Sequence, residues 1–106
     1  MKIPRPPRHL SREAKDWWKR INENWELDDA ALLILQSALE AFTRMKLAQK
    51  QIEKDGLTIE DRFGMPKENP AIAIERKSRD SMIRALKSLN LDIEPKYEKP
   101  GRPGGK

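Results

Sequence analysis

Apolar side chains near the amino terminus recur at the spacing of one helical face. Ala14, Trp17, Trp18, Ile21 and Trp25 stand at i, i+3, i+4, i+7 and i+11, which is the period of an α-helix with one apolar side. Ser11 precedes the run, and its hydroxyl can accept from the free N–H groups of a first helical turn. The pattern predicts a short helix from about Arg12 to Asn24.

A second, much longer helix is predicted between Asp28 and Gly56, because no proline or glycine interrupts this segment. Asp28 is the expected N-cap, and Gly56 is the expected left-handed stop. One apolar stripe along it comprises Leu32, Leu35, Leu39 and Phe42, and the other comprises Ala31, Ile34, Ala38, Ala41, Met45, Ala48 and Ile52. Two stripes imply two neighbours, of which one could lie within the chain and the other on a sister subunit.

A third helix is predicted from Asn69-Pro70, a cap followed by proline at the first helical position, to about Asn90. Residues 57–67 connect the two long helices, and alternating Leu57 and Ile59 give weak support for a small β-hairpin there. We therefore predict an all-α fold, in which a short N-terminal helix precedes a long antiparallel helical hairpin with a short β-like turn.

The helical domain is expected to span residues 11–91, with a flexible basic segment on each side. Residues 1–10 form a Pro-rich basic arm, in which three prolines oppose helix formation. Residues 92–106 form a Pro/Gly-rich basic tail.

Composition adds a constraint on assembly and on partners. The chain of 106 residues is 37% apolar and 37% charged, and a core this lean favours self-association. A net charge of +5 permits a nucleic-acid partner. No apolar run is long enough to span a membrane, so we expect a soluble cytoplasmic protein without membrane contact.

Catalysis has little support in the sequence. His9 is the single histidine, cysteine is absent, and no glycine-rich phosphate loop occurs. The paired carboxylates at 28–29 and 60–61 stand at helix-start and turn positions, where capping or solvation explains them. We expect no enzymatic activity, no metal and no cofactor.

Two sets of cations are the candidate DNA-binding residues, since lysine and arginine contact phosphates without reading sequence. The arm and the start of the first helix supply Lys2, Arg5, Arg8 and Arg12, and the third helix supplies Arg76, Lys77, Arg79 and Arg84. The arm has a second interpretation as a solubilising leader. The third helix also carries Lys87 as a further cation. Glu75 and Asp80 offset the positive charge of this helix, so a solvated face of mixed charge is the second interpretation there.

A third set consists of candidate oligomerisation residues: Trp17, Trp18, Ile34, Ala38, Ala41 and Met45. Adjacent tryptophans on a helix point about 100° apart, so one of them can lie at a subunit boundary. The alanine-rich stripe permits close approach of a neighbouring helix. Ordinary core packing explains this stripe equally well, and stacking of the tryptophans on bases is the less favoured alternative to packing.

Several segments, in order, resemble the P27 family of phage terminase small subunits. They are Pro-Pro-Arg-His-Leu-Ser-Arg-Glu-Ala-Lys (6–15) leading into the two tryptophans, Leu-Asp-Asp-Ala-Ala-Leu (27–32), Gly-Met-Pro-Lys-Glu-Asn-Pro (64–70) and Leu-Lys-Ser-Leu-Asn-Leu (86–91). The similarity spans roughly residues 6–92. Asn90 stands where the family usually has glycine, and the carboxy-terminal segment is short.

The resemblance implies a helical subunit in the host cytoplasm that assembles into a homo-oligomeric ring. It also implies recognition of the packaging start site on double-stranded viral DNA, and regulation of the large terminase subunit, which carries the ATPase and nuclease. Two alternatives remain open. One is a small helical DNA- or RNA-binding regulator acting as a monomer or dimer, and the other is a protein adaptor that never touches DNA.

Overall fold

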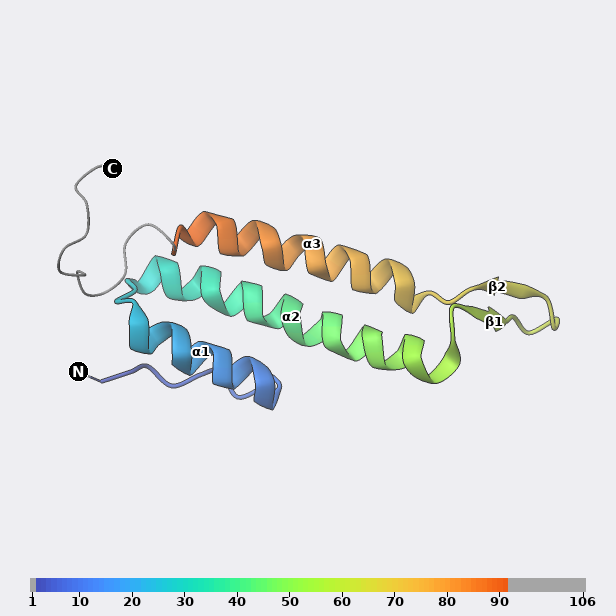
Figure 1. The fold of residues 1–106 in the computed structure, drawn as a ribbon, viewed down its shortest axis with the longest axis horizontal. Coiled ribbons are helices and arrows are strands. Elements are labelled where there is room, and N and C mark those ends of the chain that lie inside the picture. Colours follow the sequence, from blue (N-terminus) through green and yellow to red (C-terminus); the bar gives the residue numbers. More distant parts are fainter. Residues whose placement is uncertain (1, 92–106) are drawn as a thin grey trace, which may run out of the picture.

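Three helices and a small β-hairpin make up residues 2–91, the part of the chain that the computed structural model describes (Figure 1). Their order is α1 (Arg12–Asn24), α2 (Asp29–Asp55), β1 (Thr58–Glu60), β2 (Pro66–Glu68) and α3 (Ala71–Leu89). In Figure 1, α2 lies in the middle, α1 packs along its first half, and α3 runs antiparallel along its other side. The prediction of a short helix followed by a long helical hairpin is confirmed.

Local capping explains why the helices start and stop where the sequence predicts. The Ser11 hydroxyl accepts from Ala14 N (3.1 Å), and the Asp28 carboxylate accepts from Ala31 N (2.8 Å). Each bond satisfies an N–H group that has no partner inside its helix. At the far end of α3, Asn90 adopts the left-handed conformation with φ 56°, a backbone geometry that asparagine tolerates better than most residues.

Both apolar stripes of α2 are covered within the chain. Leu35 and Leu39 lie in a buried cluster with Trp18 of α1, and Ala14 and Leu10 complete it. The other stripe faces α3, where Ala38, Ala41, Met45 and Ala48 are buried. The small alanine side chains permit close helix packing. The expectation that one stripe faces a sister subunit therefore does not fit this chain, because α3 already occupies that position.

The connection between α2 and α3 is an antiparallel β-hairpin that pairs Thr58 with Glu68 and Glu60 with Pro66. The Asp61 carboxylate holds its turn by accepting from Phe63 N (2.8 Å) and Met65 N (2.9 Å). A two-stranded hairpin of this size is marginal by itself. The Asp61 carboxylate therefore stabilises the tight turn in addition to the strand pairing.

Asn69 ties the base of this hairpin to both long helices. Its side-chain oxygen accepts from Ala71 N (3.0 Å), and its side-chain nitrogen donates to the Gly56 carbonyl (2.8 Å). Its backbone N–H donates to the Leu57 carbonyl (2.8 Å), and the residue is buried. The predicted Asn-Pro start of α3 is confirmed to within one residue, since the helix begins at Ala71 directly after Pro70. The same asparagine also closes the end of α2.

Residues 2–10 lie along α1 instead of extending freely as predicted (Figure 1). The Trp18 indole N–H donates to the Pro4 carbonyl (2.8 Å), and Leu10 is buried in the core cluster. Ser11 N also donates to Thr43 Oγ1 of α2 (3.3 Å). Proline prevents the arm from becoming helical, but it leaves backbone carbonyls available to the neighbouring helix. The predicted tail at 92–106 lies outside the described residues.

Candidate nucleic-acid interface

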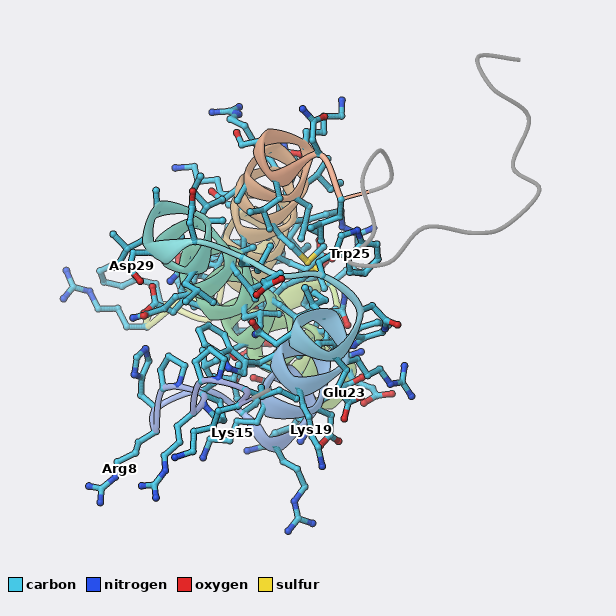
Figure 2. All side chains as sticks on the ribbon, turned by 90° about the vertical axis from the view of Figure 1, so that its left-hand side faces the viewer. Arg8, Lys15, Lys19, Glu23, Trp25 and Asp29 are labelled. Carbon is cyan, nitrogen blue, oxygen red and sulfur yellow. The ribbon has the colours of Figure 1, made fainter. Side chains whose placement is uncertain are left out.

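The arm and one side of α1 together present a basic surface. Its cations, which we call the arm–α1 surface, are Arg5, Arg8, Arg12, Lys15 and Lys19. Figure 2 shows Arg8, Lys15 and Lys19 projecting from the same side of the molecule. Arg12, Lys15 and Lys19 are spaced i, i+3 and i+7, which places them on one side of a helix. Asp16 and Glu23 stand i+4 from Arg12 and from Lys19, so two acidic side chains share this face of α1 with the three cations.

Lys15 and Lys19 were not singled out from the sequence, although their helical spacing from Arg12 was visible there. Only the placement of the arm against α1 shows that they continue the charge of Arg8. Lys2, which was predicted from the sequence as a DNA contact, is exposed but lies apart from this surface. It lines a cavity of about 360 Å³ with Trp25 and Leu27.

His9 anchors the arm close to this surface. Its Nε2 lies 2.6 Å from the Glu40 carboxylate of α2, and Gln36 Nε2 donates to the same oxygen (3.0 Å). The Gln36 amide and then His9 hold the pKa of Glu40 below its ordinary value, because both stabilise the charged carboxylate. The single histidine of the sequence thus has a positioning role on the arm.

The exposed side of α3 presents a second row of cations, which we call the α3 ridge: Arg76, Lys77, Arg84 and Lys87. All four side chains are exposed, and at 100° per residue they fall within about a third of the helix circumference. Asp80 lies among them. Arg79, also predicted as a DNA contact, instead forms an ion pair with Glu75. Arg79 and then Gln49 lower the pKa of the Glu75 carboxyl, since both hydrogen-bond to its charged form.

These two basic surfaces lie on separate faces of the molecule. In Figure 1 α2 runs between α3 and α1, while the end-on view of Figure 2 shows α2 displaced to one side, with α3 above and α1 with the arm below. Packed helices are spaced by about 8–10 Å, so the axes of α1 and α3 are at most roughly 16–20 Å apart, and Leu89 of α3 packs against the cluster that contains Trp18. The residues predicted as DNA contacts therefore form two separate sets instead of one continuous surface.

Most of the predicted oligomerisation residues are buried inside a single chain. Trp18, Ala38, Ala41 and Met45 are buried. They cannot contact a sister subunit unless α1 or α3 moves away. Trp17 is 41% exposed with Arg20 over its ring, and Ile34 is half-buried. An intersubunit role remains a prediction for these two side chains.

Other large apolar side chains are more exposed than Trp17 and were not identified from the sequence. They are Leu33 and Leu47 of α2, Leu57, Phe63 and Met65 of the hairpin segment, and Ile74 and Ile83 of α3. Phe63 and Met65 flank the turn at the end of the molecule opposite to the α1–α2 connection (Figure 1). The sequence pattern missed them because a short connection has no periodicity from which its exposed side can be derived.

Within residues 2–91, no group of three or more histidine, aspartate or glutamate side chains lies close enough together to hold a metal ion. No helix in this part of the chain is long and apolar enough to cross a membrane.

Comparison with known proteins gives one match. A family model described as phage terminase, small subunit, matches residues 14–98. This region covers α2, the hairpin, α3 and all of α1 except Arg12 and Glu13, whereas the arm lies outside it. No curated protein and no solved structure matches the chain.

Proposed function

Because this chain belongs to the phage terminase small subunits and so acts in phage DNA packaging, we propose that it binds the viral DNA at which packaging starts and regulates the large terminase subunit there. The arm–α1 surface carries the proposal. Arg8, Lys15 and Lys19 project from one side of the molecule, and Arg12 shares the helix face of the two lysines. The exposed Arg5 precedes Arg8 in the arm, which His9 and Trp18 hold in place. The P27 branch of the family remains a prediction.

Phosphate contact by this surface explains how the chain would hold DNA. Exposed lysine and arginine side chains position a protein on the duplex without reading its bases. Preference for a start site would then arise from DNA shape or from the arrangement of several subunits. Small subunits of this family generally act without catalysis, and in this proposal the ATPase and nuclease reside on the large subunit in the host cytoplasm.

The proposal predicts DNA binding with a strong salt dependence. Five phosphate contacts give a slope of about −4 to −5 in log K against log salt, since each contact contributes roughly −0.9. Fluorescence anisotropy of a labelled duplex across a salt series measures this slope. A start-site duplex and a scrambled duplex of equal length separate site recognition from general phosphate binding.

A protein adaptor is the second candidate, favoured by the exposed apolar side chains of the hairpin. Leu57, Phe63 and Met65 are 60–75% exposed on a turn whose backbone is fixed by Asp61. Rigid, exposed apolar groups are suited to protein contacts. A stable complex with the large subunit, combined with no retention on DNA at moderate salt, would favour the adaptor over DNA recognition.

We also propose that the chain assembles into a homo-oligomer, as a ring requires. Leu33 and Leu47 lie 14 residues apart on α2 and share its outer face, which neither α1 nor α3 covers. Their burial between subunits would remove apolar surface from water. Light scattering on a sizing column should give one species of several times the 12.3 kDa chain mass. A monomer at tens of micromolar would contradict a preassembled ring.

A further inference from the structure

We infer that the α3 ridge is a second DNA-binding surface, so that the protein bridges two duplex segments through two separate faces. This inference rests on the proposed function, since it takes the arm–α1 surface as the first DNA contact. The first observation behind it is the separation of the two cation sets. In Figure 2 α3 lies at the top of the molecule, whereas Arg8, Lys15 and Lys19 lie at the bottom.

The two surfaces act independently at physiological salt. Electrostatic attraction falls off over a Debye length of about 8 Å at 0.15 M salt. Arg8, Lys15 and Lys19 point away from α3 in Figure 2, so they lie farther from α3 than the roughly 8–10 Å that separates the axes of two packed helices. A straight duplex seated on one side therefore gains little attraction from the cations on the other side, and those cations remain available to another segment.

The composition of the ridge favours phosphate over an acidic protein surface. Its outer face also carries Asp80, and Ile83, which is 43% exposed, lies at the edge of the ridge beside Arg76. Protein interfaces usually have an apolar centre inside a polar rim, which this face lacks. A row of cations along 11 residues, roughly 16 Å of helix, is sufficient for contact with a phosphate backbone.

Charge pairing distinguishes the ridge from an ordinary solvated helix face. Among residues 2–91, α3 forms one ion pair, which joins Arg79 to Glu75 at the edge of the ridge nearer α2, where Gln49 of α2 also bonds Glu75. Asp80 is the one acid among the four ridge cations. The outer side of α3 thus keeps an excess positive charge after the ion pair is counted.

Energy transfer between two duplexes tests the inference directly. Identical short duplexes, one with a donor dye and one with an acceptor, are mixed with wild-type protein at low salt. We expect energy transfer that decreases as salt is raised. The ridge variant Lys77→Glu/Arg84→Glu and the arm variant Arg8→Glu/Arg12→Glu should each still bind one duplex, with energy transfer reduced at least tenfold.

A matched control separates position from total charge. Arg62→Glu/Lys67→Glu on the hairpin changes the net charge by the same amount and should keep the energy transfer. Circular dichroism checks folding, and Lys77→Ala/Arg84→Ala tests the ridge again without introducing repulsion. A homo-oligomer that bridged DNA through the arms of two subunits would keep its energy transfer in both ridge variants, and this result would overturn the inference.

The wild-type result distinguishes the two proposals. Binding of a single duplex without energy transfer at any ratio of protein to DNA would refute bridging and leave the proposed function intact. This is also the outcome expected if the ridge serves an acidic protein. Failure to bind even one duplex at low salt would refute the proposed function itself.

Discussion

Replacing Trp18 by alanine should lower the free energy of unfolding by about 3–5 kcal/mol, the usual cost of removing a buried large aromatic side chain. Trp18 is 4% exposed and lies in the cluster formed with Leu35 and Leu39. Its indole N–H also holds the arm through the Pro4 carbonyl. Since small domains have only about 5–15 kcal/mol of stability, this single change should remove a large share of it.

The adjacent tryptophan supplies a matched control for this prediction. Trp17 is 41% exposed, so the same substitution there should cost less than about 1 kcal/mol. Urea unfolding followed by circular dichroism at 222 nm compares the variants without depending on tryptophan fluorescence. All samples need one protein concentration, because self-association would shift the apparent stability. Equal losses for the two variants would show that the packing of α1 on α2 is wrong.

The second large effect concerns DNA affinity. Replacing Arg5, Arg8 and Arg12 together by alanine removes three expected phosphate contacts. The slope of log K against log salt should become less steep by about 2.7, and affinity near 0.15 M salt should fall about 100-fold. The difference should nearly vanish at 1 M salt, because counterion release no longer favours binding there.

Anisotropy titrations across salt measure this change, with Lys54→Ala/Arg62→Ala/Lys67→Ala as the control. These three cations lie at the hairpin end of the molecule, outside both basic surfaces, and their removal lowers the net charge by the same three units. The control should keep most of the wild-type slope. If both triple variants lost affinity equally, total charge and not the arm would determine binding.

Local sequence alone determined the three helices, since a cap or a stop is decided by a few neighbouring residues. Ser11, Asp28 and Asn69 cap their helices as predicted, and Asn90 ends α3 in the left-handed conformation. The order of motifs along the chain likewise indicated the terminase small subunit family, which the family match confirms. None of these conclusions depends on which elements touch one another.

Tertiary structure alone decided what each surface contacts. The two stripes of α2 indicated two neighbours, but periodicity does not identify a neighbour, and both proved to be helices of the same chain. The prolines predicted a free arm, whereas the Trp18 indole N–H and the buried Leu10 hold it on α1. The cations of the arm and of α3 lie on separate faces of the molecule for the same reason. A sequence pattern shows which residues share one face of a helix. Only the packing of the helices in three dimensions decides which other residues that face contacts.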